Sequence, residues 1–148
     1  MLRMWRLTGE RHYFDYVEAW VDSLINEKGE IHLYDMSTYN LDFINSGKVL
    51  FDVYRETGND KYKKAMDELI KQLKRQPRTL EGGYWHKLIY QHQMWLDGLY
   101  MASPFMAQYG AEFNRPEWID EAVKQFALCH KHTYDAGTGL YHLSLIHI

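Results

Sequence analysis

Two aspartates have the residue type and spacing for acid–base chemistry. Asp97 lies in the segment Gln93–Met101 (QMWLDGLYM), where an apolar helix is predicted to begin, and Asp42 stands at the same point of the preceding apolar segment. Because the two positions are about one internal repeat apart, we expect both carboxylates at one mouth of a helical array. Two carboxylates in an apolar cleft can differ in proton affinity, which gives one acid and one base. The alternative is that both aspartates are helix N-caps, a position that Asp favours.

Histidines near these aspartates add further candidates. His86 and His92 lie in the segment before Asp97, and an imidazole there could hydrogen-bond a ligand or titrate near neutral pH. A lone histidine is also commonly a structural residue. His130 and His132 have no HExxH motif or cysteine pair beside them, so no metal site is predicted. The sequence also lacks a GxGxxG or Walker loop and a nucleophile elbow, and we therefore expect no cofactor.

The elements that would position these residues form a repeat of helical hairpins. Thr8–Tyr13 (TGERHY) resembles Thr57–Tyr62 (TGNDKY), and a looser third copy begins at Tyr109–Gly110, at a spacing of about 50 residues. Each glycine is expected to end one helix and to precede a return helix. The apolar stripes predicted for the three return helices are Tyr13, Val17, Trp20, Val21 and Leu24; Tyr62, Ala65, Met66, Leu69, Ile70 and Leu73; and Trp118, Ala122, Val123 and Phe126.

The helices between these stripes are predicted to be buried. Leu41 to Tyr54 and Trp95 to Tyr109 carry few charges, so they should be inner helices that alternate with outer ones. Long aromatic segments, 26–40 and 76–94, lead from outer to inner helices, and such loops are where function tends to lie.

Composition narrows the class of protein. The chain has 148 residues, of which 46% are hydrophobic, 25% are charged and 16% are aromatic, and it carries one cysteine. A net charge of −3 without a basic stripe argues against a nucleic-acid partner. The apolar runs are shorter than the ~20 residues that span a bilayer, and no signal peptide is visible, so we expect no membrane partner and a cytoplasmic protein.

Four segments resemble the unsaturated rhamnogalacturonyl hydrolases, glycoside hydrolase family 105, which is grouped with the unsaturated glucuronyl hydrolases of family 88. They are Glu81–Lys87 (EGGYWHK), Gln93–Met101, Leu41–Gly47 (LDFINSG) and Lys131–His142. The resemblance implies an all-α fold, the (α/α)6 barrel of inner and outer helices. It also implies that the substrate is a pectin oligosaccharide that a lyase has left with a 4,5-unsaturated uronic acid at its non-reducing end.

The resemblance further implies a reaction and a set of roles. An acid protonates C4 of the enol ether, water adds at C5, and the resulting hemiketal opens to release the next sugar. By motif, Asp97 would be the general acid and base, and Asp42 would bind the unsaturated sugar and help set the protonation of Asp97. Trp95 would stack on the sugar ring, His86 would hydrogen-bond it, and His142 would belong to the same pocket.

The resemblance covers residues 1–142, which we interpret as about half of a barrel, whereas residues 143–148 form an atypical tail that matches no family motif. We expect half a barrel to be poorly soluble or inactive by itself, because its inner helices would be exposed. Two other interpretations remain open. One is a helical-hairpin repeat protein that binds partners without catalysis. The other is a different (α/α)6 sugar enzyme, such as an epimerase, which would need a pair of histidines.

Overall fold

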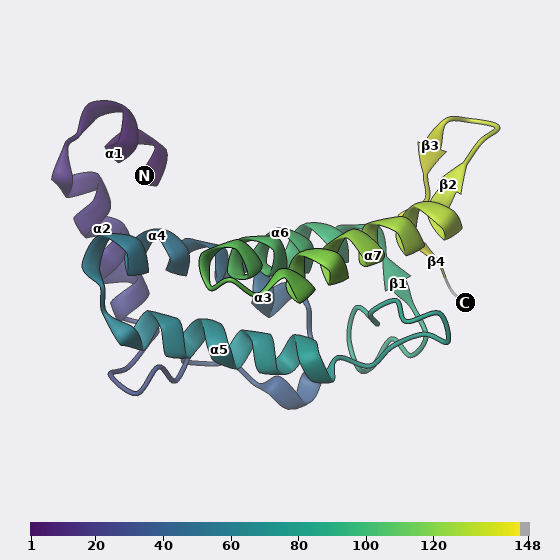
Figure 1. Cartoon of the computed structure of the whole chain (residues 1–148), viewed down its shortest axis with the longest axis horizontal. Coiled ribbons are helices and arrows are strands. Elements are labelled where there is room, and N and C mark those ends of the chain that lie inside the picture. The colour runs from purple at the N-terminus through teal and green to yellow at the C-terminus, as the bar shows by residue number, and fades with distance from the viewer. Residues whose placement is uncertain (146–148) are drawn as a thin grey trace.

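The computed structural model describes residues 1–145, and helices dominate it (Figure 1). The α-helices are α1 (Leu2–Thr8), α2 (Arg11–Asp22), α3 (Asp42–Ser46), α4 (Lys48–Thr57), α5 (Asp60–Arg75), α6 (Leu96–Glu112) and α7 (Pro116–Thr133), with a 3-10 turn, η1, at Met36–Thr38. Four two-residue strands complete the described part of the chain: β1 (Met94–Trp95), β2 (Tyr134–Asp135), β3 (Leu140–Tyr141) and β4 (Ser144–Leu145).

The helices pack as three consecutive hairpins, as the repeat predicts. α1 packs on α2, α4 packs on α5, and α6 packs on α7, while α3 and α4 also contact α6. Figure 1 shows α6 and α7 side by side across the middle of the molecule, with α5 running along one side of them. Phe51 of α4 and Phe105 of α6 are fully buried in the core that joins these helices, with ring centroids 5.3 Å apart. The predicted alternation of inner and outer helices is therefore confirmed.

Two of the three glycine turns are as predicted. Gly9 follows α1 and Gly58 follows α4, and both adopt the left-handed conformation that commonly ends a helix, with φ of 73° and 66°, which glycine reaches without steric strain. The third prediction was wrong, because Gly110 lies inside α6. It serves close packing instead: a Cβ there would lie 2.8 Å from the carbonyl oxygen of Arg115. The left-handed turn falls at Asn114, with φ of 52°.

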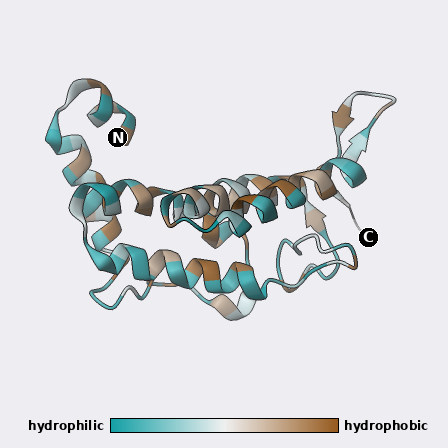
Figure 2. Ribbon diagram, viewed as in Figure 1, coloured by the Kyte–Doolittle hydropathy of each residue, from teal (hydrophilic) through white to brown (hydrophobic). Residues whose placement is uncertain are grey.

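The outer helices bury one face each, and the sequence located that face best for α5. All six residues of its predicted stripe are buried, and α5 shows both hydrophobic and hydrophilic stretches in Figure 2. In α2 the buried face is centred on Phe14 rather than on Trp20, which is 48% exposed. Phe14 also packs against Trp5 of α1, with ring centroids 4.8 Å apart, and this contact could not be inferred from helical periodicity.

The predicted stripe of α7 was wrong in half of its members. Trp118 and Ala122 are buried, but Val123 is 63% and Phe126 is 52% exposed. The buried face continues through Gln125 and Cys129, and Gln125 is a polar residue that an apolar-stripe search passes over. Its side chain accepts a hydrogen bond from the backbone N–H of Tyr84 and donates to the carbonyl oxygen of Gly82, so the amide is satisfied in the interior.

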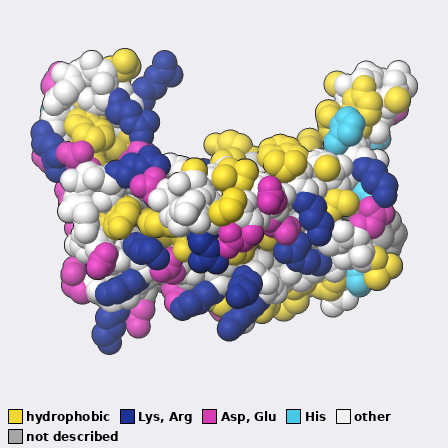
Figure 3. All heavy atoms as spheres, in the orientation of Figure 1, with side chains coloured by type: hydrophobic (Ala, Val, Ile, Leu, Met, Phe, Trp, Pro, Cys, Tyr) yellow, Lys and Arg dark blue, Asp and Glu magenta, His cyan; other side chains and the backbone are white. Residues whose placement is uncertain are grey.

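The inner helices are also less completely buried than predicted. Tyr100, in α6, is 65% exposed although the helix carries few charges. Figure 3 shows hydrophobic side chains gathered along the edge of the molecule over α6 and α7. No helix in residues 1–145 combines the length and the apolar character needed to cross a membrane.

The short strands join the end of the described chain to the start of α6. β4 pairs antiparallel with β1, so that Ser144 lies opposite Trp95, and the backbone N–H of Leu96 donates to the carbonyl oxygen of Leu143. β2 and β3 form a hairpin beyond α7 (Figure 1). In the predicted tail, Ser144 and Leu145 therefore pair with β1 and Leu143 bonds to the start of α6, whereas residues 146–148 lie outside the described residues.

Candidate active site

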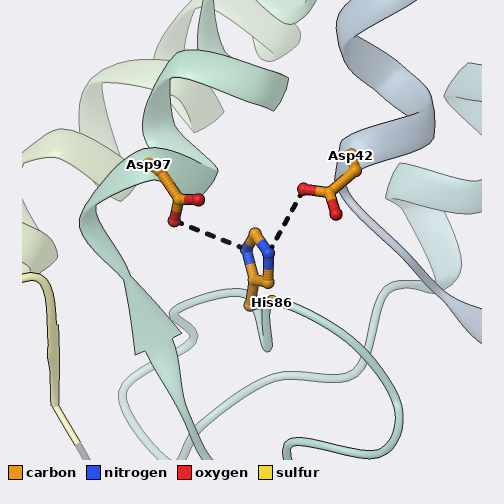
Figure 4. Close-up of side chains that lie close together, drawn as sticks. All are labelled: Asp42, His86 and Asp97. Carbon is orange, nitrogen blue, oxygen red and sulfur yellow. Dashed lines mark ion pairs between the residues drawn. The ribbon is translucent and has the colours of Figure 1, made fainter.

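Asp42, His86 and Asp97 converge from three separate segments of the chain. His86 Nε2 lies 3.3 Å from Asp42 Oδ1, and His86 Nδ1 lies 3.9 Å from Asp97 Oδ1. Figure 4 shows the imidazole between the two carboxylates, with a different ring nitrogen facing each. His86 is 1% exposed, whereas each aspartate side chain is 39% exposed. Each aspartate side chain is therefore partly open to a ligand, although Asp97 Oδ1 itself is buried, and the histidine lies behind them.

Backbone hydrogen bonds place His86 between the two helices. Its carbonyl oxygen accepts from the N–H of Leu41, at the start of α3, with 3.0 Å between N and O. Its own N–H donates to the carbonyl oxygen of Gln93, just before β1, at 2.9 Å. Gly98 makes room on the α6 side, since a Cβ at that position would lie 3.2 Å from His86 Nδ1. The loop is thus fixed to both helices that carry the aspartates.

Two buried glutamines, Gln72 in α5 and Gln76 directly after it, hold the loops together, and neither was predicted from the sequence. Gln76 donates from Nε2 to the carbonyl oxygens of Tyr39 and Trp85, at 2.7 and 2.8 Å. Gln72 donates to the carbonyl oxygen of Asn40 at 3.1 Å. Both glutamines lie on the helix face that packs inward, and a polar residue on such a face is the signal that could have revealed them.

The alternative that the aspartates are helix N-caps was wrong. The cap positions are Leu41 for α3 and Trp95 for α6, and neither aspartate side chain makes a capping hydrogen bond. Asp42 and Asp97 both lie in the first turn of their helices, where the helix dipole favours a negative charge. Their carboxylates are therefore available to face His86.

Lys87 adds a positive charge to the site, and this residue was not among those predicted from the sequence. Its Nζ lies 2.7 Å from Asp42 Oδ2, so Asp42 uses one oxygen for Lys87 and the other for His86. The residue stands in the EGGYWHK segment directly after His86. A basic residue adjacent to a candidate histidine could have marked it.

Aromatic rings cover one side of the site. Trp95 stacks on His86, with centroids 4.8 Å apart and planes 8° apart, and Tyr90 stacks on Trp95 at 5.0 Å and 10°. The indole N–H of Trp95 donates to Gln93 Oε1 at 3.1 Å. Trp95 is thus fixed beside the carboxylates, in contact with His86 and Tyr90.

His142 is the predicted residue that the structure does not bring into contact with this cluster. It is exposed, and its backbone N–H donates to the carbonyl oxygen of Thr133. No contact among the described residues joins it to Asp42, His86 or Asp97. However, His142 directly precedes Leu143, whose carbonyl oxygen accepts a hydrogen bond from the backbone N–H of Leu96 at the start of α6. Its membership of the pocket stays a prediction.

The three converging side chains are close enough to offer one atom each to a cation, since those atoms lie within 4.8 Å of one another. A single ion could use only one nitrogen of His86, because the two nitrogens point in different directions (Figure 4). The arrangement suits shared protons better than a shared ion, because each nitrogen faces its own carboxylate.

The buried position of His86 gives the protein a pH dependence. Burial lowers the pKa of His86 below its ordinary value of 6.5, and the negative charges of Asp97 and Asp42 oppose this effect only in part. Below pH 6.5 the imidazole of the unfolded chain binds a proton, whereas the buried imidazole of the folded chain does so only at a lower pH. The contribution of the neutral His86 to the free energy of unfolding should therefore be fully present above about pH 6.5 and should be lost as the pH falls through the lowered pKa.

We expect His86→Gln to flatten this part of the pH dependence of unfolding. Urea denaturation at a series of pH values measures the slope, and the same substitution at the exposed His12 controls for the change of residue type. An unchanged slope in His86→Gln, after the control is subtracted, would show that His86 does not take up a proton on unfolding.

Comparisons with known proteins give the class of this chain. The model of Glycosyl Hydrolase Family 88 matches residues 1–145. The unsaturated rhamnogalacturonyl hydrolase YesR of Bacillus subtilis (strain 168) is 24% identical over 141 residues, which cover 91% of this chain and 39% of the relative. The chain therefore belongs to glycosyl hydrolase family 88, and it spans about 40% of the length of the relatives it matches.

Comparison with solved structures agrees with this family assignment. A glycoside hydrolase from family 105 of C. acetobutylicum ATCC 824 superposes with a TM-score of 0.94 and 40% identity, over 98% of this chain and 40% of that chain. A possible member of the same family from Salmonella enterica gives a TM-score of 0.82 and 26% identity, over 97% and 37%. The predicted fold class is thus confirmed: the chain is part of an all-α, six-hairpin fold.

Proposed function

We propose that this chain carries the acid–base site of a glycoside hydrolase that acts on 4,5-unsaturated uronates at the non-reducing end of lyase-generated pectin oligosaccharides. The observation that supports it most is the pair of half-exposed carboxylates, Asp42 and Asp97, held on either side of one buried histidine in a chain of this family. YesR is named as an unsaturated rhamnogalacturonyl hydrolase, which supports rhamnogalacturonan as the source of the oligosaccharide.

In this proposal Asp97 acts as acid and then as base. Its carboxylic acid gives a proton to C4 of the enol ether, and water adds to C5. The resulting Asp97 carboxylate accepts the proton that this water loses, so the acid is regenerated. The hemiketal formed at C5 opens and releases the next sugar. Asp42 binds the unsaturated sugar and helps keep the proton on Asp97 beforehand.

The aromatic side chains supply the binding surface. Trp95 lies one residue before Leu96, at the start of α6, and its ring is held parallel to those of Tyr90 and His86. A flat apolar ring beside two carboxylates suits a sugar ring that carries a planar double bond. Trp95 is therefore the residue proposed to stack on the substrate. His86 is buried behind the carboxylates, which favours a role in positioning them over direct contact with the sugar.

The same gathering of residues weighs against the two other interpretations. A repeat protein that only binds partners has no need of two carboxylates and a buried imidazole at one point. An epimerase would need two histidines as acid and base, whereas His86 is the one histidine that contacts these carboxylates within residues 1–145. The expected absence of nucleic-acid and membrane partners and the cytoplasmic location stay predictions.

A chimera tests the proposed function, because the chain spans only part of its relatives. Residues 1–145 replace the corresponding 40% of the C. acetobutylicum protein, to which they are 40% identical. The substrate is a lyase-digested rhamnogalacturonan disaccharide, and loss of the ultraviolet absorbance of its enol-ether acid measures turnover.

We expect the chimera to consume the unsaturated disaccharide and to leave the saturated disaccharide unchanged. The unaltered C. acetobutylicum protein is the positive control, and circular dichroism and a melting curve establish that the chimera folds. A folded chimera without turnover, beside an active control, would overturn the proposal.

A further inference from the structure

We propose that Lys87, Asp42 and His86 are positioning residues that fix the place of one proton at the site. Lys87 pairs with the Asp42 carboxylate, Asp42 holds the ring hydrogen of His86 on Nε2, and the bare Nδ1 accepts a hydrogen bond from the carboxylic acid of Asp97. The part that concerns catalysis rests on the proposed function, in which Asp97 is the acid. The state of the imidazole itself does not, and it can be measured without a substrate.

The first step is the ion pair between Lys87 and Asp42. Lys87 Nζ lies 2.7 Å from Asp42 Oδ2, and the Lys87 side chain is 26% exposed, so solvent screens the pair only in part. Among the described residues, Asp42 is the one carboxylate within ion-pair distance of Lys87. The ammonium of Lys87 therefore attracts the negative charge of the Asp42 carboxylate at this distance.

The second step is the contact between Asp42 and Nε2 of His86. An ionised carboxylate can only accept hydrogen bonds, and its free oxygen, Oδ1, lies 3.3 Å from Nε2. The contact is favourable only when Nε2 carries a hydrogen. A neutral imidazole has a single N–H, so Nδ1 is then an acceptor.

The third step concerns two buried atoms that have no other partner. His86 Nδ1 and Asp97 Oδ1 are both inaccessible to solvent and make no hydrogen bond in residues 1–145, and they face each other at 3.9 Å. If both were bare acceptors, two buried lone pairs would remain unsatisfied, which costs about 1–3 kcal/mol for each group. One proton between them removes this cost in the unliganded site. In the proposed function the Asp97 carboxyl group then turns, so that this proton leaves the buried contact and faces C4 of the substrate.

Burial decides on which of the two atoms that proton resides. Placing it on Nδ1 would create an imidazolium in the interior, and burial lowers the pKa of His86. The groups that face the ring are Asp97 from α6, Asp42 from α3 and Lys87 from the loop, while Trp95 covers one face without charge. With Lys87 and Asp42 neutralising each other, the arrangement is neutral when Asp97 holds the proton.

The direct test is NMR of the His86 ring nitrogens in the folded chimera, with ¹⁵N introduced only at histidine. We expect the Nε2–H tautomer in the unaltered protein. In Lys87→Met, the loss of the ammonium lets Asp42 compete with Asp97 for the proton. A protonated Asp42 donates a hydrogen bond to Nε2, so the ring hydrogen of His86 moves to Nδ1. Lys87→Arg should keep the Nε2–H tautomer. Lys71→Met, which removes a similar lysine–carboxylate pair from the exposed face of α5, is the matched control. An Nδ1–H tautomer in the unaltered chain, or no change in Lys87→Met, would overturn the proposal.

The second test is the pH dependence of turnover in the chimera. We expect Lys87→Met to lower kcat about tenfold, the factor that corresponds to one pKa unit, with a smaller change in KM. Because the site then carries one positive charge less, it binds its proton more tightly, and the alkaline limb of the profile should move to higher pH. Lys87→Arg, which keeps the positive charge, should leave both kcat and the alkaline limb of the profile close to those of the unaltered chimera.

A rise in KM with an unmoved pH profile would show that Lys87 only binds substrate, and it would contradict its positioning role. The two tests also separate this proposal from the proposed function. An inactive but folded chimera counts against the function, whereas the tautomer of His86 tests the arrangement of the proton in either case.

Discussion

Asp97→Asn is expected to lower kcat of the chimera by about 10²–10⁴-fold, the range that general acid–base catalysis contributes. Asparagine has nearly the same size as aspartate but cannot give a proton to C4 or take one from water. Its amide can still donate a hydrogen bond to His86 Nδ1, so the site should keep its shape. KM should change little, because the substitution removes a proton donor and leaves the binding surface of Trp95 in place.

A control separates this effect from general damage to α6 or α7. Asp120→Asn makes the same chemical change at an exposed position of α7 and should leave turnover unchanged. Turnover is measured as loss of the enol-ether absorbance at several substrate concentrations, and folding as a melting curve. A folded Asp97→Asn chimera with turnover near that of the unaltered chimera would remove Asp97 from the role of acid.

Much of the frame that positions Asp97 could be predicted from the sequence. The Thr-Gly repeat fixed the turns at Gly9 and Gly58, because glycine at a helix end has a specific conformational cause. The stripe of α5 was predictable because its opposite face is rich in lysine. The equivalence of Asp42 and Asp97 also follows from the repeat, since both begin inner helices.

The contacts within the site were less predictable because they depend on loops and on polar residues in the interior. His86 lies between the aspartates through backbone bonds to Leu41 and Gln93, and backbone bonds leave no side-chain pattern. Gln72, Gln76 and Gln125 are buried for their hydrogen bonds, so hydropathy places them wrongly. Hydropathy made the opposite error at Val123 and Phe126, which were predicted to be buried and are exposed, because an apolar residue is not always a buried one.

Gly47→Val is expected to lower the free energy of unfolding by about 3 kcal/mol, at the upper end of the usual cost of overpacking a core. Gly47 lies between α3 and α4 with ordinary helical dihedral angles, so its value is space and not conformational freedom. A Cβ there would press against the Leu69 side chain and would lie 2.9 Å from Phe105 Cε2. Both neighbours are almost fully buried and have nowhere to move. The helix-propensity difference between glycine and valine, below about 1 kcal/mol, cannot offset this.

The same substitution should also disturb the site, because α3 carries Asp42 only a turn and a half before Gly47. Displacing α3 from α5 and α6 would lengthen the contact between Asp42 and His86, and the ring hydrogen on Nε2 should then exchange faster with water. Urea denaturation measures the stability, and NMR of the His86 ring measures the contact. Gly137→Val, in the β2–β3 hairpin, is the matched control, since a Cβ there meets only the Asp135 carboxylate, at 3.2 Å. Equal stability of the two variants would show that α3 and α4 can move apart, and that the close approach at Gly47 does not position Asp42.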